Sequence, residues 1–144
     1  MAEPTLDFDY YAGLPGAVPP RELLRAAVDA LDHAYSPYST VQVGCVVATS
    51  SGGRYIGANV ENASYPATIC AERVALTSAV VHETHPLTAA TIVVVGRPDL
   101  GFSPCGICRQ VITELAPDAT VHFVFDHHWE AKPASALLPQ GFTL

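Results

Sequence analysis

Residues 41–60 read VQVGCVVATSSGGRYIGANV, and this stretch decides the fold. Its first half, 41–49, is a run rich in β-branched residues, which favours a strand. The Ser-Gly cluster at 50–53 favours a turn, and 54–60 favours a returning strand. The stretch therefore predicts an antiparallel hairpin.

Helical and strand patterns alternate on both sides of this hairpin. Pro19 and Pro20 suit a helix start, and apolar residues at helical spacing then predict an amphipathic helix over 20–35. The other predicted elements are a buried helix over 69–82, a strand over 90–96, a helix over 105–115, a strand over 120–126, and a weak strand or turn of helix before Leu138.

This order of elements predicts an α/β domain. We expect a three-layer α/β/α sandwich with a mixed sheet of about five strands, in which the hairpin comes first and parallel strands follow. Near-continuous apolar strands indicate that helices cover both faces. Residues 19–144 are expected to form one domain, and residues 1–18, which show no clear period, an irregular N-terminal arm.

Composition limits the classes of partner. The formal net charge is −7 and only seven residues are Lys or Arg, which disfavours nucleic acid and favours a small polar substrate. The apolar runs are too short to cross a bilayer, and the N-terminus lacks the pattern of a signal peptide. We expect a cytoplasmic protein with no membrane partner, whose four cysteines are metal ligands or catalytic groups before they are disulfides.

Three of the cysteines are spaced as metal ligands. Cys105 and Cys108 are three apart at the start of a predicted helix, so both sulfurs lie on one face of its first turn. Cys70 stands at the start of another predicted helix. Helix N-termini lower the pKa of a thiol, and thiolates select zinc over hard cations. Two such helix starts pointing at one spot predict a three-thiolate zinc site.

Three protein ligands leave a fourth position open, which is typical of catalytic zinc. Water in that position becomes acidic enough to yield hydroxide near neutral pH. Glu72, two residues after Cys70, is free to move a proton between that water and a substrate. Cys45 is an alternative fourth ligand that would close the site. Its place in an apolar strand favours a buried small hydrophobe instead.

These residues resemble the cytidine deaminase family of the small, three-cysteine zinc type. The zinc-deaminase signature is H-x-E followed by P-C-x-x-C, with Cys allowed for the His. Here it is matched by Cys70-Ala71-Glu72 and Pro104-Cys105-Gly106-Ile107-Cys108. The resemblance extends over roughly residues 20–142 and includes Arg73, Arg109-Gln110, Ala34-Tyr35-Ser36-Pro37-Tyr38-Ser39, Val43-Gly44, Asn59-Val60-Glu61-Asn62-Ala63-Ser64-Tyr65 and Leu137-Leu138-Pro139-Gln140-Gly141-Phe142.

The resemblance implies a role for each substrate contact. Asn59 and Glu61 would hydrogen-bond the ribose hydroxyls; without the resemblance, a polar loop after a strand is the simpler interpretation. The backbone N–H of Ala71 would meet the carbonyl oxygen of the base. The backbone carbonyl of Ser103 would face the leaving amine.

The resemblance also implies an outer shell and an assembly. Arg73 would donate to a zinc-bound thiolate, and Gln110 would lie in the same outer shell. The family's three-cysteine members are typically homotetramers with one zinc ion per subunit and active sites shared between subunits. Tyr65 and Phe142 match positions that reach across, although both aromatic side chains equally fit a core.

The chain departs from the family pattern at three places. Val41 stands where the family usually has a Phe that packs on the pyrimidine ring, which weakens base binding or makes room for a larger base. Cys45 stands where Ala is common. Residues 126–130, DHHWE, replace a short turn. We expect an exposed loop there rather than a histidine metal site, with Trp129 covering either an apolar patch or a site mouth.

The predicted function is hydrolytic deamination of cytidine and deoxycytidine to uridine and deoxyuridine, with release of ammonia. An alternative is a deaminase of a modified cytosine nucleoside, N4-substituted or blasticidin-like. A non-catalytic zinc protein is disfavoured by Glu72. A polynucleotide deaminase is disfavoured by the acidic charge.

Overall fold

The computed structural model describes residues 5–83, 85–96 and 102–144. In chain order, the elements are α1 (Phe8–Gly13), α2 (Arg21–Ala30), a 3₁₀ turn (Leu31–His33), β1 (Gly44–Ala48), β2 (Arg54–Ala58), a 3₁₀ turn (Tyr65–Ala67), α3 (Ala71–His82), β3 (Thr91–Val95), α4 (Gly106–Leu115), β4 (Thr120–Phe125), β5 (His128–Pro133) and α5 (Ala134–Leu137). Within these described ranges, no helix is long and apolar enough to cross a membrane.

The five strands form one mixed sheet in the order β2-β1-β3-β4-β5. The predicted hairpin is confirmed, since β1 pairs antiparallel with β2 and places Cys45 opposite Gly57. β3 is antiparallel to β1 and parallel to β4, as the intervening helix α4 requires. The expectation of parallel strands after the hairpin is wrong for β5, which is antiparallel to β4. The two-residue turn of Asp126 and His127, both at positive φ, reverses the chain directly.

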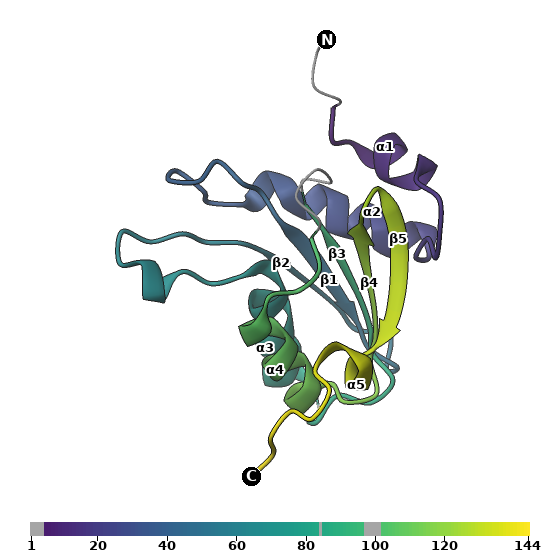
Figure 1. Cartoon of the computed structure of the whole chain (residues 1–144), viewed down its shortest axis with the longest axis vertical. Helices are drawn as coiled ribbons and strands as arrows, with labels where there is room; N and C mark the ends of the chain where they lie inside the picture. The colour runs from purple at the N-terminus through teal and green to yellow at the C-terminus, as the bar shows by residue number, and fades with distance from the viewer. Residues whose placement is uncertain (1–4, 84, 97–101) are drawn as a thin grey trace.

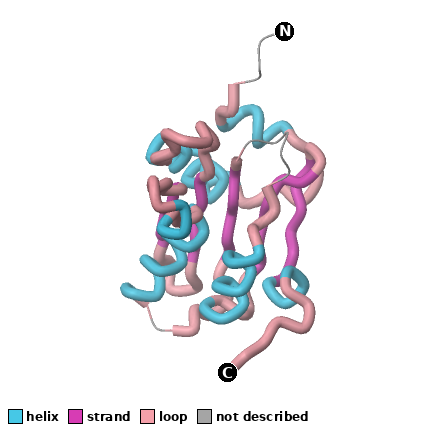
Figure 2. The backbone as a smooth tube through the Cα atoms, turned by 60° about the vertical axis from the view of Figure 1, so that its left-hand side comes forward, coloured by secondary structure: helices cyan, strands magenta, loops and turns pink. Residues whose placement is uncertain are grey.

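Helices cover both faces of the sheet, as the apolar strands predicted. α1 and α2 lie on one face, and α3, α4 and α5 on the other (Figures 1 and 2). Because side chains alternate along a strand, successive residues of β1 and β3 face the two layers in turn. The buried set on the α3 side includes Cys45, Val47, Ile92 and Val94, and the set on the α2 side includes Val46, Val93, Val95 and Val124.

The side chain of Asn59 shortens the predicted hairpin strand at its start. The amide oxygen of Asn59 accepts from the Val43 N–H at 2.8 Å, and its amide nitrogen donates to the Val41 carbonyl at 2.8 Å. The Val43 N–H and the Val41 carbonyl therefore bond to a side chain, whereas the Val43 carbonyl still accepts the backbone N–H of Asn59 at 3.3 Å. The strand β1 begins at Gly44, not at Val41.

The expected irregular arm is wrong for Phe8–Gly13, which forms α1. The Asp7 side chain caps this helix by accepting the Tyr10 N–H at 3.0 Å. Phe8 and Tyr11 are buried, and the Tyr11 hydroxyl donates to the Gly96 carbonyl at 2.8 Å. Packing against the rest of the fold thus stabilises a helix whose sequence shows no helical spacing of apolar residues. Residues 1–4 of the arm lie outside the described residues.

The expected exposed loop around Trp129 is also wrong, because residues 128–133 form β5. Trp129 is only 2% exposed, and its indole N–H donates to the Tyr11 carbonyl at 2.9 Å. The Trp129 backbone bonds to both sides of Gly16: its N–H donates to Pro15 and its carbonyl accepts from Ala17. A Cβ on Gly16 would lie 2.3 Å from the Trp129 carbonyl oxygen, so only glycine fits. Of the two alternatives for Trp129, covering an apolar patch is the correct one.

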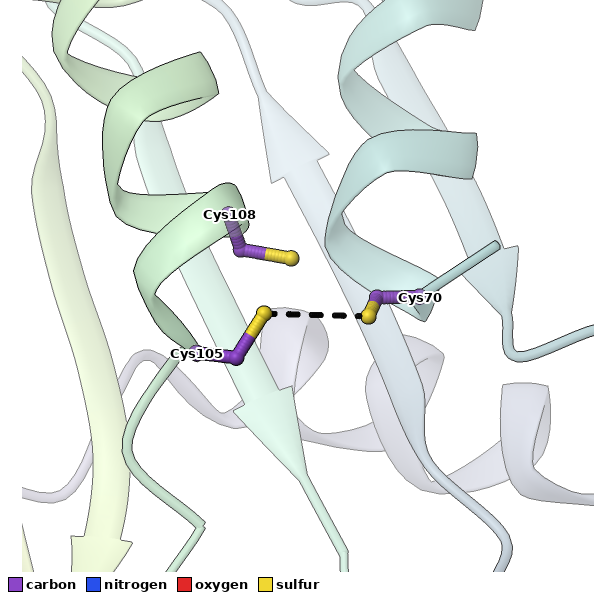
Figure 3. A group of neighbouring side chains, drawn as sticks. All are labelled: Cys70, Cys105 and Cys108. Carbon is purple, nitrogen blue, oxygen red and sulfur yellow. Dashed lines mark hydrogen bonds between the residues drawn. The ribbon is translucent and has the colours of Figure 1, made fainter. Parts of the chain in front are cut away.

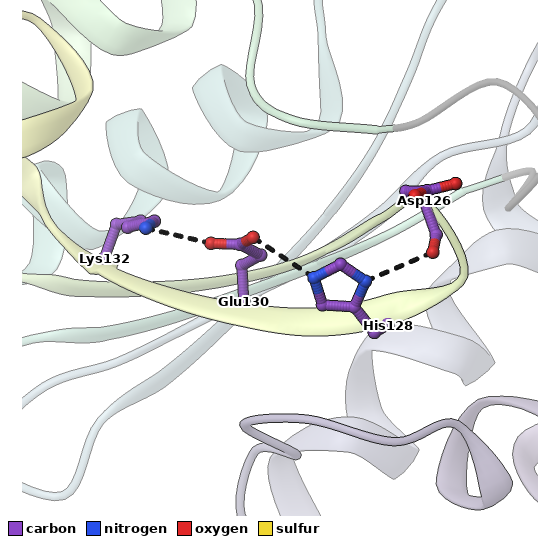
Figure 4. Close-up of polar contacts among 4 residues, drawn as sticks. All are labelled: Asp126, His128, Glu130 and Lys132. Atoms are coloured by element: carbon purple, nitrogen blue, oxygen red, sulfur yellow. Dashed lines mark hydrogen bonds and ion pairs between the residues drawn. The ribbon is translucent and has the colours of Figure 1, made fainter.

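The opposite face of β5 carries a row of polar side chains, shown in Figure 4. Glu130 pairs with Lys132 at 3.0 Å and with His128 at 3.3 Å, and a ring nitrogen of His128 lies 3.1 Å from the Asp126 carbonyl. Lys132 is the main cause of the lowered pKa of Glu130. Within the described part of the chain, the group that could hold a metal ion is the cysteine group, and His127 and His128 are not in it.

Candidate active site

Three cysteines meet where α3 and α4 begin. Cys70 is the N-cap of α3, Cys105 is the N-cap of α4, and Cys108 lies in the first turn of α4. Figure 3 shows the three side chains pointing toward one space between the helix starts. The predicted cysteine cluster is therefore assembled by the fold.

The distances between the sulfurs suit a single metal ion. The Cys70 and Cys105 sulfurs are 3.9 Å apart, and all three sulfurs lie within 4.8 Å of one another. Zinc–sulfur bonds of about 2.3 Å at tetrahedral angles place sulfurs about 3.8 Å apart. All three cysteines are free thiols, and they range from exposed Cys105 through half-buried Cys70 to buried Cys108. The donor set and its spacing fit zinc, and the exposed side gives a substrate access.

The electrostatics favour thiolate at Cys70. The Cys108 thiol is the largest cause that lowers the pKa of Cys70, to about 5, and the Arg73 guanidinium acts in the same direction. The interaction between the Cys70 and Cys108 sulfurs, together with burial, raises the pKa of Cys108. A dication held by these sulfurs would displace their protons.

Arg73 lies close enough to the Cys70 sulfur to lower the pKa of its thiol. One guanidinium nitrogen, Nη2, donates to the Thr68 carbonyl at 2.9 Å, which fixes the side chain against the turn before α3. Its Nε is buried and has no hydrogen-bond partner in the described residues. The positive charge beside the sulfurs offsets the excess negative charge of three thiolates on one dication.

Glu72 lies in the first turn of α3, two residues after Cys70 in the chain. It is buried, with 5% of its surface exposed, and burial is the largest cause that raises its pKa to about 7. A carboxyl group with a pKa near neutrality can both accept and donate a proton, which suits a general acid–base group.

Cys45 lies in the core of the sheet, below the site. It is fully buried on β1, and burial raises the pKa of its thiol, with the charge of Glu72 adding to the effect. It does not belong to the group of clustered sulfurs. The sequence-based interpretation of Cys45 as a buried small hydrophobe fits this position.

Asn59 and Glu61 hold the loop before β1. Asn59 is buried and clasps the backbone of Val41 and Val43. The Glu61 carboxylate accepts the N–H of Tyr38, the N–H of Ser39 and the Ser39 hydroxyl. Ser39 is the largest cause of the lowered pKa of Glu61. Both side chains therefore shape the loop, a role that spacing alone did not reveal.

Ala71 and Ser103 lie beside the site cysteines in the chain, whereas Val41 lies in the segment before β1. Ala71 is the first residue of α3, where helices leave backbone N–H groups without helical partners. A Cβ on Gly57 would lie 2.2 Å from the Ala71 carbonyl, so this glycine lets α3 pack directly on β2. Ser103 precedes the turn into α4, and Val41 is half-buried against the core on the α3 side.

The remaining predicted residues lie at the surface of the single chain. Tyr65 is 72% exposed and Phe142 is 68% exposed, so neither is a core residue. The Tyr65 ring contacts the Tyr38 ring edge to face, at 6.2 Å between centroids. Gln110 is half-buried on α4, two residues after Cys108.

Arg109 borders the site, and the motif match did not reveal the contacts that it makes. It follows Cys108, and its guanidinium donates to the carbonyls of Pro104 and Leu137 and to the Ser103 hydroxyl. One of these partners, Leu137, is 28 residues away. A long-range bond of this kind leaves no periodic signal, so the sequence offered only the presence of an arginine beside the cysteines.

The family follows from comparison with known proteins. Residues 19–124 match the family model described as the cytidine and deoxycytidylate deaminase zinc-binding region. The chain belongs to this family. Among curated relatives of this deaminase chain, the cytidine deaminase of Halalkalibacterium halodurans is 40% identical over 123 residues, covering 84% of this chain and 92% of the relative. The cytidine deaminase of Mycoplasma pneumoniae is 38% identical over 98 residues, or 68% of this chain and 73% of the relative.

Solved structures share the fold of this family member. The cytidine deaminase from Burkholderia pseudomallei matches with a TM-score of 0.77 at 40% identity, covering 84% of this chain and 97% of that one. The cytidine deaminase from Mycobacterium tuberculosis matches with a TM-score of 0.69 at 30% identity, covering 83% and 93%. The three-layer fold with its mixed sheet is thus a cytidine deaminase-like fold.

Proposed function

We propose that this chain catalyses the zinc-dependent hydrolytic deamination of cytidine and deoxycytidine, giving the uridine nucleoside and ammonia. The proposal rests on the group of three sulfurs at two helix starts. The buried Glu72 carboxyl lies two residues after Cys70, in the first turn of α3. Membership of the deaminase family and relatives named cytidine deaminase support the substrate.

Zinc held by Cys70, Cys105 and Cys108 would lower the pKa of a water molecule in its open fourth position. Glu72 would take a proton from the attacking water and deliver it to ring nitrogen N3 as the C4–O bond forms. Glu72 then passes the second proton to the exocyclic amine, which leaves as ammonia. One water is consumed for each nucleoside, and the C4–N bond is replaced by a C4–O bond.

The proposed substrate contacts surround this centre. The Ala71 N–H donates to the carbonyl oxygen of the base, and the Ser103 carbonyl accepts from the leaving amine. Asn59 and Glu61 bind the ribose hydroxyls with the hydrogen-bonding capacity left after they hold the loop before β1. A sugar site built in this way discriminates against analogues that lack the hydroxyl.

The test is the ultraviolet absorbance change on mixing the purified, zinc-loaded chain with cytidine. The chain is expected to turn over cytidine, whereas Glu72→Gln keeps zinc and loses a factor of about 10²–10⁴ in kcat. Absence of turnover by the wild-type chain at micromolar enzyme would contradict the proposal. A Glu72→Gln variant as active as wild type would contradict the role given to Glu72.

The second candidate substrate is a modified cytosine nucleoside, N4-substituted or blasticidin-like. Val41 favours it, because this half-buried aliphatic residue stands where a ring-stacking Phe is usual and leaves more room at the base. Turnover of cytidine and of N4-substituted cytidines is compared in wild type and Val41→Phe. The variant is expected to turn over cytidine faster and the N4-substituted cytidines more slowly than wild type. Unchanged selectivity would contradict a role for Val41 in substrate choice.

We also propose a cytoplasmic homotetramer with one zinc ion per subunit and shared active sites, formed by a deaminase domain over residues 19–144. The support is the large exposure of the Tyr65 and Phe142 rings in the single chain, together with the family membership. Light scattering coupled to gel filtration measures the number of subunits, and metal analysis measures the number of zinc ions per subunit. A monomer with full activity would contradict shared sites.

A further inference from the structure

Arg109 joins two chain segments that border the cysteine site. Its Nε donates to the Pro104 carbonyl at 2.7 Å, and Nη2 donates to the Ser103 hydroxyl at 3.1 Å. Its Nη1 donates to the Leu137 carbonyl at 2.8 Å, at the end of α5. One half-buried guanidinium therefore holds both the segment that enters α4 and the last turn of α5.

The acceptors show that shape, more than charge, is what this side chain provides. All three are neutral oxygens, two backbone carbonyls and one hydroxyl. A planar guanidinium presents five donors in a fixed fork. When it bonds three acceptors at once, the relative positions of those acceptors are restricted to the ones that the fork can reach. A lysine ammonium in the same place is a single point donor on a flexible stem.

The segment held by Arg109 leads directly to a metal ligand. Ser103 and Pro104 precede Cys105, whose sulfur lies 3.9 Å from that of Cys70. Arg109 itself follows Cys108, and its own backbone N–H donates to the Cys105 carbonyl at 2.9 Å. Movement of this segment would shift the Cys105 ligand and the Ser103 carbonyl together.

The second segment leads to the C-terminus. α4 and α5 contact each other on one face of the sheet, and α5 is a helix of only four residues (Figure 1). So short a helix depends on its surroundings, because helix nucleation is unfavourable without packing, and α5 buries Ala134 and Leu137 in the core. The bond from Arg109 to the Leu137 carbonyl fixes the point from which residues 138–144 continue.

We propose that Arg109 is a positioning residue for the deamination step: it sets the Ser103–Cys105 segment against α5 and so fixes the orientation of the Ser103 carbonyl and of the Cys105 sulfur. Its effect on rate rests on the proposed function. It acts through neighbouring groups and does not contact the reacting atoms.

The test compares Arg109→Ala, Arg109→Lys and the matched control Arg54→Ala. Arg54 is an exposed arginine of β2 that pairs with Glu22 of α2, a helix on the other face of the sheet from α3 and α4 (Figure 1). Each full-length variant is loaded with Zn²⁺ for kinetics and with Co²⁺ for its thiolate charge-transfer spectrum. Arg109→Ala is expected to keep the metal, lose about 10- to 100-fold in kcat with KM within about threefold, and shift the Co²⁺ bands. Arg54→Ala is expected to match wild type in both readouts.

Arg109→Lys keeps the charge and most of the stem, so it remains informative if Arg109→Ala does not fold. It is expected to leave kcat well below wild type and the Co²⁺ bands shifted; full restoration of both would overturn the proposal, as would unchanged kcat and bands in folded Arg109→Ala. If the wild-type chain fails to deaminate cytidine, the proposed function fails. The Co²⁺ spectra of wild type and variants then still decide whether Arg109 sets the ligand geometry.

Discussion

The cysteine site and the edge around Trp129 are both built from segments distant in the chain, but by different forces. At the site, two polar helix starts 35 residues apart bring Cys70 and Cys105 together. At the edge, Trp129 packs on α1 and bonds to Tyr11, 118 residues away. The first region carries chemistry and leaves Cys105 exposed, whereas the second is closed, with Trp129 and Tyr11 buried.

Function and stability depend on different regions of this fold. Loss of a group at the cysteine site removes a ligand or a proton carrier and leaves the core intact. Loss of a group at the edge removes buried apolar contacts and leaves the ligands in place. The two regions should therefore respond oppositely when activity and unfolding are measured on the same variants.

The largest expected effect is on Cys105. Cys105→Ala should lose zinc and more than about 100-fold in turnover, because even groups around a metal's ligands are worth up to that factor. The matched control is Cys45→Ala, which should retain zinc and turnover and cost about 1 kcal/mol in the free energy of unfolding through the small cavity it leaves. Metal analysis, kinetics and urea unfolding measure the pair. Loss of zinc from Cys45→Ala would show that Cys45 is a ligand.

Trp129→Ala should reverse this pattern. Removing a buried tryptophan from the α1–β5 contact should cost about 3–5 kcal/mol in the free energy of unfolding. Turnover per folded molecule, measured well below the unfolding transition, should stay within about threefold of wild type because catalytic and edge contacts are separate. A loss of kcat as large as that of Cys105→Ala would show that the edge is part of the catalytic machinery.

Tyr11→Phe is the smallest of the three changes. It removes only the hydroxyl that donates to the Gly96 carbonyl at 2.8 Å, which should cost about 0.5–1.5 kcal/mol in the free energy of unfolding. Turnover at neutral pH should be unchanged, and urea unfolding measures the loss. A larger cost than that of Trp129→Ala would contradict the ranking of contacts at this edge.

The same variant carries a pH test. Burial raises the pKa of Tyr11 above the ordinary tyrosine value of 10.0. The unfolded chain therefore loses this proton first as pH rises, so the contribution of Tyr11 to stability is present below that ordinary value and is lost above it. Unfolding curves at neutral pH and above pH 10 should show wild type losing more stability than Tyr11→Phe. Equal losses would contradict burial of the Tyr11 hydroxyl.

The sequence was sufficient for whatever depends on local pattern. The helix starts at Cys70 and Cys105 and the antiparallel hairpin predicted over 41–60 follow from spacing and turn residues. The structure confirms them, with hairpin strands over 44–48 and 54–58. The α1 helix was missed, and β5 was predicted only as a weak strand or turn of helix before Leu138, because the two elements depend on each other. Neither has a periodic pattern long enough to predict it alone, and their contact spans most of the chain.

The same distinction holds within the candidate site. Cysteine spacing predicted the cluster, whereas the clasp of Asn59 on Val41 and Val43 and the bonds of Arg109 to Ser103 and Leu137 were visible only in the fold. A polar side chain can bond any backbone group that the fold brings within reach. Residue type alone therefore does not reveal which backbone they hold.

A three-thiolate zinc site with an open fourth position can be checked by X-ray absorption at the zinc edge of the loaded chain. The predicted spectrum has three sulfur neighbours at about 2.3 Å and one light neighbour at about 2.0 Å. Cys45→Ala should give the same spectrum. Four sulfur neighbours in the wild-type chain would mean a closed structural site and would contradict the proposed deamination.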